Sequence, residues 1–172
     1  MKKVIVTICA LLLLTTTAAS QTRKRTTKKS SSSATKPANA ELAANASART
    51  DGATRVANQI KNLTTFLYLL GGVARGIEDL DAAAKTGQPS PTNEKFKAQL
   101  RQSFSDFRVG LDALEVYFRN TPALQGYYTK LVGSASGAAE AESQAAAGRF
   151  NQAGRTLVGA VGRLADVLVV MH

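Results

Sequence analysis

The chain contains 172 residues, of which 22 are Lys or Arg and 12 are Asp or Glu, so its formal net charge is +10. It has one Cys and one His, and that His is residue 172. A single Cys excludes an intramolecular disulfide, a Cys-based zinc site and a CxxCH haem attachment. A single His leaves little room for His-based catalysis or metal binding. The length fits one domain with a core of ordinary size.

The first residues predict a secretory signal peptide over residues 1–20. Two lysines precede an apolar run of 11 residues from Val4 to Leu14, and small or polar residues follow as far as Ser20. This order is typical of cleaved leaders. A membrane anchor is not expected, because a spanning helix needs about 20 apolar residues. We therefore expect a secreted or periplasmic protein without a transmembrane span in the mature chain, and Cys9 leaves with the leader.

Residues 21–40, here called the basic tail, contain no acidic and no large apolar residue. Such a segment cannot bury enough surface to offset its ordering entropy, so it predicts a disordered linker. Its cations attract polyanions, and anionic components of a cell envelope are the expected partners. Nucleic acid is not expected, because no aromatic residue is present to stack on bases. A solvated spacer is the alternative. The candidate anion-binding residues are Arg23, Lys24, Arg25, Lys28, Lys29 and Lys36.

Residues 41–172 form the predicted domain, which is nearly neutral, with 14 basic and 12 acidic residues. Its apolar residues recur every three or four positions in four segments, and no segment alternates with period two. This spacing predicts four amphipathic helices and an all-α fold. Short connections favour antiparallel neighbours, so the sequence predicts an up-and-down antiparallel four-helix bundle. The predicted core residues are Val56, Ile60, Leu63, Leu67, Leu70, Ala74 and Ile77; Phe96, Leu100, Phe104 (or Ser103), Phe107, Leu111, Leu114 and Phe118; Leu124, Tyr128 (or Tyr127), Leu131, Ala135, Ala138, Ala141 and Ala145; and Phe150, Ala153, Leu157, Val161 (or Ala160), Leu164, Leu168 and Met171.

Local signals mark the connections between these helices. Gly87 is expected to end the first helix. Ser90-Pro91 and Thr121-Pro122 each predict a cap followed by a proline at the first helical position. Residues 147–153 resemble the tight inter-helix turn of tetratricopeptide repeats, although no 34-residue period recurs. That turn predicts a helical hairpin at Gly148.

The second half of the third predicted helix and the first half of the fourth together contain five glycines, each of which costs about 1 kcal/mol of helix propensity relative to Ala. Glycine is expected in a helix in spite of this cost where two helix backbones approach so closely that a Cβ would not fit between them. The alternative is that small residues leave a cavity for a small apolar ligand between these two helices. The glycines are Gly133, Gly137, Gly154, Gly159 and Gly162.

The sequence offers no catalytic, metal-binding or cofactor-binding set. It has many Ser and Thr but no His placed to activate one, no GxSxG elbow and no glycine-rich phosphate loop after a strand. The acidic cluster of Glu78, Asp79 and Asp81 is expected to be a hydrated helix surface. We therefore expect a non-enzymatic binding or structural module without a cofactor, the alternative being a small-ligand carrier or sensor.

Two further features suggest contacts with a partner. Tyr117, Tyr127 and Tyr128 are expected at one end of the bundle as an aromatic contact patch, with rim packing as the alternative. Phe66 and Tyr68 are expected within a turn or two of the same level. The last apolar run, residues 167–171, is apolar on every face, so a partner protein or a second copy is expected to cover part of it.

Overall fold

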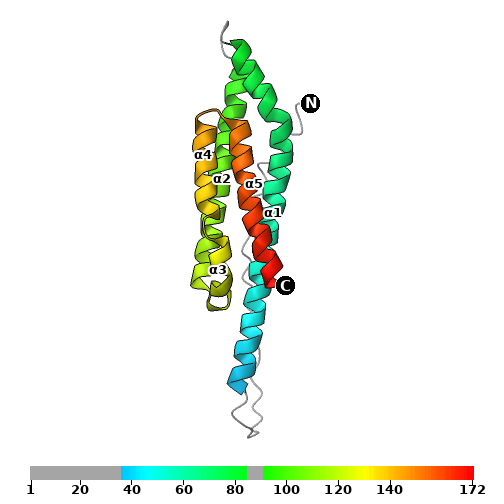
Figure 1. Ribbon diagram of the computed structural model, residues 1–172, viewed down its shortest axis with the longest axis vertical. Helices are drawn as coiled ribbons and strands as arrows, with labels where there is room; N and C mark the ends of the chain where they lie inside the picture. The colour runs from blue at the N-terminus through cyan, green and yellow to red at the C-terminus, as the bar shows by residue number, and fades with distance from the viewer. Residues whose placement is uncertain (1–35, 85–90) are drawn as a thin grey trace, which may run out of the picture. The chain divides into compact units, whose positions relative to one another are not determined.

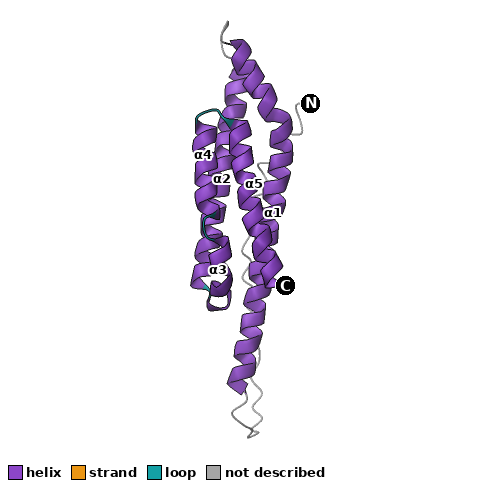
Figure 2. Ribbon diagram, viewed as in Figure 1, coloured by secondary structure: helices purple, strands orange, loops and turns teal. Residues whose placement is uncertain are grey.

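The computed structural model describes residues 36–84 and 91–172. These residues form helices joined by turns, and no strand occurs among them (Figure 2). The prediction of an all-α fold is therefore confirmed for this part of the chain. The predicted signal peptide and residues 21–35 of the basic tail lie outside the described residues. Within the described ranges, no helix combines the length and apolar character needed to cross a membrane.

The helix ends agree with the sequence signals at several places. α2 begins at Pro91, as predicted, and ends at Asn120, just before Thr121-Pro122. The last helix begins at Phe150, just after the turn predicted at Gly148. α1 begins earlier than the expected boundary at Glu41, so Lys36–Ala40 of the basic tail are helical. The elements in chain order are α1 (Lys36–Ala84), α2 (Pro91–Asn120), the 3₁₀ turn η1 (Pro122–Leu124), α3 (Gln125–Leu131), α4 (Ser134–Ala146) and α5 (Phe150–Met171).

The third predicted helix is not continuous, and this prediction was wrong. It is divided into η1, α3 and α4, although its apolar spacing continues through the breaks. At the second break Gly133 has φ = +91°, a left-handed conformation that side-chain-bearing residues rarely adopt. Thr121 does not cap η1; instead its hydroxyl donates to the carbonyl oxygen of Tyr117 at 2.8 Å. Periodicity therefore identified the buried face but not the course of the backbone.

The hairpin predicted at Gly148 is confirmed. Gly148 has φ = +77° and its N–H donates to the carbonyl oxygen of Ala145 at 3.0 Å. The N–H of Arg149 donates to the carbonyl oxygen of Gln144 at 2.9 Å. These two bonds form a Schellman motif, which satisfies the last carbonyl groups of α4 and turns the chain into α5.

Contacts at both ends of the helices define their relative directions. α2 runs antiparallel to α1, because Asp81 near the end of α1 contacts Asn93 near the start of α2, whereas Asp51 contacts Tyr117. α5 also runs antiparallel to α1, as Figure 1 shows. Gly154 lies against Leu70 and Gly52 against Met171. Similarly, α4 runs antiparallel to α2 (Ala135 with Glu115, Ala145 with Arg101) and to α5 (Gln144 with Thr156).

The four predicted apolar stripes meet in one core. Most of their residues are buried and the rest are partly buried against them. Where the prediction left alternatives, the structure buries Phe104 and Ala160, and Tyr127 and Tyr128 are both half-buried. At the end of α5 the fully buried residue is Val167, whereas the predicted Leu168 is half-buried.

The interpretation of the glycines as sites where two helix backbones approach closely is not confirmed at Gly154, which lies against side chains of α1. A Cβ there would lie 2.9 Å from Cδ2 of Leu70, closer than real Cβ contacts. It was wrong for Gly137, Gly159 and Gly162, where a Cβ would meet no atom of the described chain within 4 Å. At Gly133 the glycine is required by its backbone conformation instead.

Candidate functional site

The cations of the basic tail fall mostly outside the described residues. Lys36 is the first residue of α1. The remaining five predicted anion-binding residues are not described by the structure, so their grouping stays a prediction. These are Arg23, Lys24, Arg25, Lys28 and Lys29.

Tyr117 is held in a small polar network between α1 and α2. Its hydroxyl donates to Oδ2 of Asp51 at 2.9 Å, and the guanidinium of Arg55 lies 4.2 Å from the centre of its ring. Arg55 also donates to Oδ2 of Asp51 at 3.2 Å. The bond from Tyr117, assisted by Arg55, holds the pKa of Asp51 below its ordinary value. Burial, reinforced by Asp51, raises the pKa of the Tyr117 hydroxyl. The phenol is thus already engaged by its own chain.

Phe66 does not lie within a turn or two of Tyr117, so this part of the prediction was wrong. Phe66 lies with Phe104 and Phe107, at ring-centroid distances of 5.2 and 4.9 Å. Tyr117 contacts α1 at Asp51 and Arg55, at least 11 residues from Phe66, which is roughly 16 Å along the helix. Tyr127 and Tyr128 pack against the core as half-buried side chains.

The predicted acidic cluster is partly neutralised. Asp81 accepts a bond from Nδ2 of Asn93 at 2.8 Å and lies 2.6 Å from Nζ of Lys97. Lys97 also contacts Glu94 at 2.7 Å. Hydrogen bonds first to Asp81 and then to Glu94 raise the pKa of Lys97. Asp79 is exposed. Within the cluster, the ammonium group of Lys97 therefore neutralises Asp81.

Sequence reasoning missed two polar contacts that hold the broken helix. The N–H of Ala135, in the first turn of α4, donates to Oε1 of Glu115 at 2.8 Å. Nη1 of Arg163 donates to the carbonyl oxygen of Val132, just after α3, at 3.1 Å. A carboxylate thus meets the start of one helix and a guanidinium meets the end of another, as helix dipoles favour. Helical periodicity carries no signal for either contact, because both join residues far apart in sequence.

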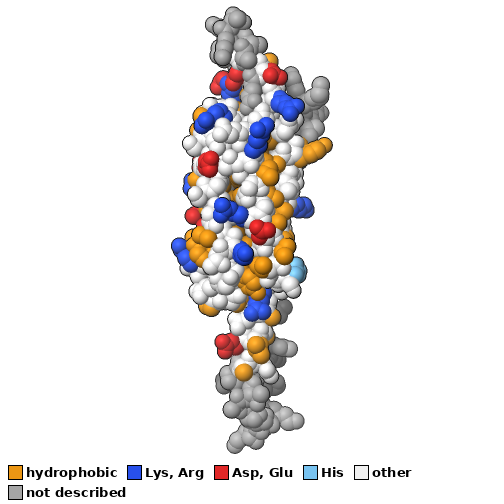
Figure 3. Space-filling view, in the orientation of Figure 1, with side chains coloured by type: hydrophobic (Ala, Val, Ile, Leu, Met, Phe, Trp, Pro, Cys, Tyr) orange, Lys and Arg blue, Asp and Glu red, His pale blue; other side chains and the backbone are white. Residues whose placement is uncertain are grey.

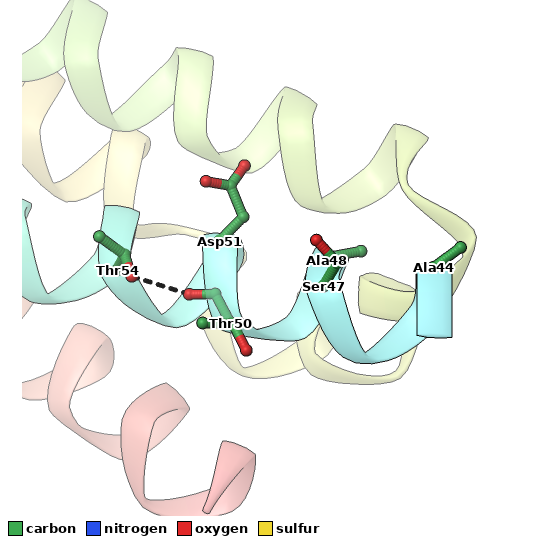
Figure 4. Close-up of a pocket in the computed structure, with 6 residues that line it drawn as sticks. All are labelled: Ala44, Ser47, Ala48, Thr50, Asp51 and Thr54. Carbon is green, nitrogen blue, oxygen red and sulfur yellow. Dashed lines mark hydrogen bonds between the residues drawn. The ribbon is translucent and has the colours of Figure 1, made fainter. Parts of the chain in front are cut away.

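Two shallow hollows occur on the surface of α1. The first is lined by α1 alone, and in Figure 4 its Asp51 side chain points toward α2. Small side chains and threonines line the rest, and Thr54 donates to the carbonyl oxygen of Thr50 at 2.8 Å. The second lies between α1 and α5. Its lining residues are Arg49, Thr50, Ala53, Thr54, Ala57, Leu168, Met171 and His172.

Apart from its Arg49 and His172, the second hollow is one end of a longer uncharged surface, here called the α1–α5 face. Tyr68, Val158 and Val169 are its most exposed large side chains, at 84%, 56% and 76%. Figure 3 shows apolar side chains gathered along α5 and the neighbouring part of α1 in that view. The residues of the face are Ala53, Ala57, Ile60, Thr64, Leu67, Tyr68 and Gly71 of α1, and Val158, Val161, Gly162, Ala165, Leu168 and Val169 of α5.

The C-terminal apolar run contributes to this face. Val167 points into the core at 0% exposure, whereas Val169 and Val170 are 76% and 45% exposed. The run is therefore divided between a buried side and an uncovered side. An all-apolar helix surface with an uncovered side is a feature of interaction sites.

The comparisons with known proteins found no protein related to this chain. No family model matches the chain, and no match was found among the curated proteins or the solved structures. Among the described residues, no group of three or more His, Cys, Asp and Glu side chains is placed to hold a metal ion. The functional proposal therefore rests on the fold and on the surfaces described above.

Proposed function

We propose that this protein is a secreted or periplasmic, non-enzymatic module that acts by binding, with its helices forming an up-and-down antiparallel four-helix bundle. In this arrangement η1, α3 and α4 together make the third arm. The antiparallel contacts of α1 with α2 and α5, and of α4 with α2 and α5, support the bundle.

The observation that carries the binding role is the α1–α5 face. A helix of a monomeric bundle normally keeps one polar side. α5 does keep an exposed charged side, with Arg155, Arg163 and Asp166. In addition to its buried stripe through Leu157 and Leu164, however, it has an uncharged exposed stripe through Val158, Gly162 and Val169. An exposed apolar surface of this extent is typical of an interaction site.

The packing favours this role over the alternative of a small-ligand carrier. A small-ligand carrier needs a cavity between the third arm and α5. In the described structure, the facing side chains of α4 and α5 are alanines and one leucine, all at most 2% exposed, and neither of the two hollows lies between these helices. The facing residues are Ala138, Ala141, Ala145, Ala153, Leu157 and Ala160.

The basic tail is proposed to hold this module against an anionic surface of the envelope. Its six cations carry most of the net charge of the chain outside the predicted leader. Each Lys or Arg near an anionic lipid surface contributes about 1 kcal/mol of attraction. The tyrosine patch is not proposed as a second contact, because the hydroxyl of Tyr117 is already bonded to Asp51.

The test is co-sedimentation of the purified full chain with phosphatidylglycerol vesicles and with neutral phosphatidylcholine vesicles. We expect binding to the anionic vesicles only, and its loss in about 0.5 M salt, where the Debye length is only a few ångströms. Replacing the six tail cations with Gln should weaken binding at least about 100-fold.

A matched control removes the same charge from the helical domain. The six cations that this control replaces are exposed, and none of them forms an ion pair within the described residues. If this control loses as much affinity as the tail variant, the tail is not the anchor and the proposal is wrong. The control replaces Arg75, Lys95, Arg119, Lys130, Arg149 and Arg155 with Gln.

A further inference from the structure

The α1–α5 face has opposite charges on its two long edges. Lys61 borders the face on α1, since it lies four residues after Ala57 and three before Thr64. Asp166 borders it on α5, since it lies four residues after Gly162 and three before Val169. Lys61 and Asp166 are exposed, and neither forms an ion pair within the described residues. A cation and an anion therefore flank an uncharged surface from opposite sides.

These two charges lie at similar levels along the helices. The contacts of Gly154 with Leu70 and of Met171 with Gly52 set the register between α5 and α1. In this register Asp166 is offset from Lys61 by about three to four residues, or roughly 5 Å along the axis. Side chains of a helix lean toward its N-terminus, and α1 and α5 are antiparallel. The two side chains therefore lean toward each other's level, which reduces the offset.

We propose that the α1–α5 face binds a second copy of this chain, about a twofold axis that runs along the helices. This symmetry lays α1 of one copy over α5 of the other, so that Lys61 faces the partner's Asp166 and Asp166 faces the partner's Lys61. The face is then self-complementary in charge, as a twofold interface requires. This inference rests on the binding role proposed above for the same face, and it names the partner.

The hydroxyl of Thr64 and the cations at the edges of the face are compatible with such burial. The hydroxyl of Thr64 donates to the carbonyl oxygens of Ile60 and Lys61, at 2.8 and 3.1 Å, so covering it leaves no unsatisfied donor. Among the edge cations, Arg75 and the partner's Arg155 are offset by about six to seven residues, or roughly 10 Å. That distance exceeds the Debye length of about 8 Å at physiological salt, so their repulsion is screened.

The α1–α5 face is also large enough for a specific interface between two copies. From Ala53 to Gly71 it is about 27 Å long, and two neighbouring helices make it about 20 Å wide. A specific interface buries about 800 Å² on each partner. A corrugated face of these dimensions, with Tyr68, Val158 and Val169 projecting from it, is large enough for that area.

The first test is sedimentation equilibrium of the full chain over a range of concentrations. We expect a mass twice that of the 18.1 kDa chain, or twice that of its mature form if the leader is removed. Val158→Lys should weaken dimerisation at least about 30-fold, because it buries an unpaired charge at the centre of the interface. The matched control is Val109→Lys on α2, where the valine is 55% exposed against 56% at Val158. This control should leave the dimer unchanged.

The second test examines the symmetry by exchanging charges. Lys61→Asp and Asp166→Lys should each weaken the dimer by about tenfold, since each creates two like-charge contacts. The variant with both changes should restore the affinity. Additive weakening in the double variant would overturn the proposed orientation.

Three other outcomes would overturn the proposal. They are a chain that stays monomeric at every concentration, a dimer that Val158→Lys does not affect, and a monomer whose vesicle binding is lost with Val158→Lys. The third result would assign the face to a lipid surface. The tail-variant vesicle experiment is independent of dimerisation, so failure of the dimer and failure of the envelope anchor can be told apart.

Discussion

Two glycines four residues apart should respond in opposite ways to substitution by Ala. Gly137 lies inside α4, and a Cβ there would meet no atom of the described chain within 4 Å. Gly137→Ala should therefore stabilise the fold by about 1 kcal/mol through helix propensity. Gly133 has φ = +91° and ends the break between α3 and α4. A side chain in that conformation costs about 1–2 kcal/mol.

A second cost at Gly133 arises from its neighbour. A Cβ at this position would lie 2.7 Å from Nη1 of Arg163, the atom that donates to the carbonyl oxygen of Val132. Moving the guanidinium weakens an exposed hydrogen bond with a net value of about 1 kcal/mol. Together, the backbone and contact terms predict that Gly133→Ala destabilises the fold by about 2–3 kcal/mol.

Urea unfolding followed by circular dichroism measures both changes. The two variants should differ by about 3–4 kcal/mol, which is the sum of the gain and the loss. The slope of the free energy against urea should stay constant, because both variants bury the same surface. If Gly133→Ala stabilises the protein as Gly137→Ala does, residues 125–146 form an unbroken helix and the argument for the break is refuted.

Two further predictions concern the core and the α1–α2 contact. Phe104→Ala should lower the free energy of unfolding by about 4 kcal/mol, because the ring of Phe104 is fully buried. Phe107 is only half-buried, so Phe107→Ala should lower it clearly less in the same urea assay. Equal losses would contradict the assigned core. Tyr117 and Arg55 lower the pKa of Asp51 in the folded state below its ordinary value of 3.8. Their bonds to Asp51 therefore stabilise the fold above pH 3.8, and this stability is lost as the pH falls through the lower pKa of the folded state. Tyr117→Phe should raise the pKa of Asp51 toward 3.8 in a carboxyl NMR titration, and an unchanged value would show that the hydrogen bond is not made in solution.

The sequence predicted the buried faces more accurately than the backbone that carries them. Leu124, Leu131 and Ala138 keep helical spacing although two breaks separate them, because side chains facing one core need only approximate periodicity. The turn at Gly148 was predictable because its glycine and the following Phe150 are a local signal. The break at Gly133 was not, because its glycine resembles Gly137 in sequence and differs only in backbone conformation.

The candidate surface was predictable only in part. Residues 167–171 are apolar on every face, which identified a run with more apolar surface than one core can cover. The rotation of α5 about its own axis, which packing against its neighbours sets, decides which of these residues stays exposed. In the structure Val167, rather than Leu168, is fully buried. The pairing of Lys61 and Asp166 across a shared face has no sequence signal, because their helices are joined only through the rest of the fold.

The sequence by itself determined the all-α class, the apolar stripes, the near-neutral charge of the domain and the concentration of cations in the basic tail. These properties follow from local composition and from the period of 3.6 residues, which each helix expresses independently. Tertiary structure decided the break at Gly133, the contacts of Glu115 and Arg163 that hold it, and the alignment of α1 with α5. These depend on distances between residues remote in the chain, which packing sets and local periodicity does not.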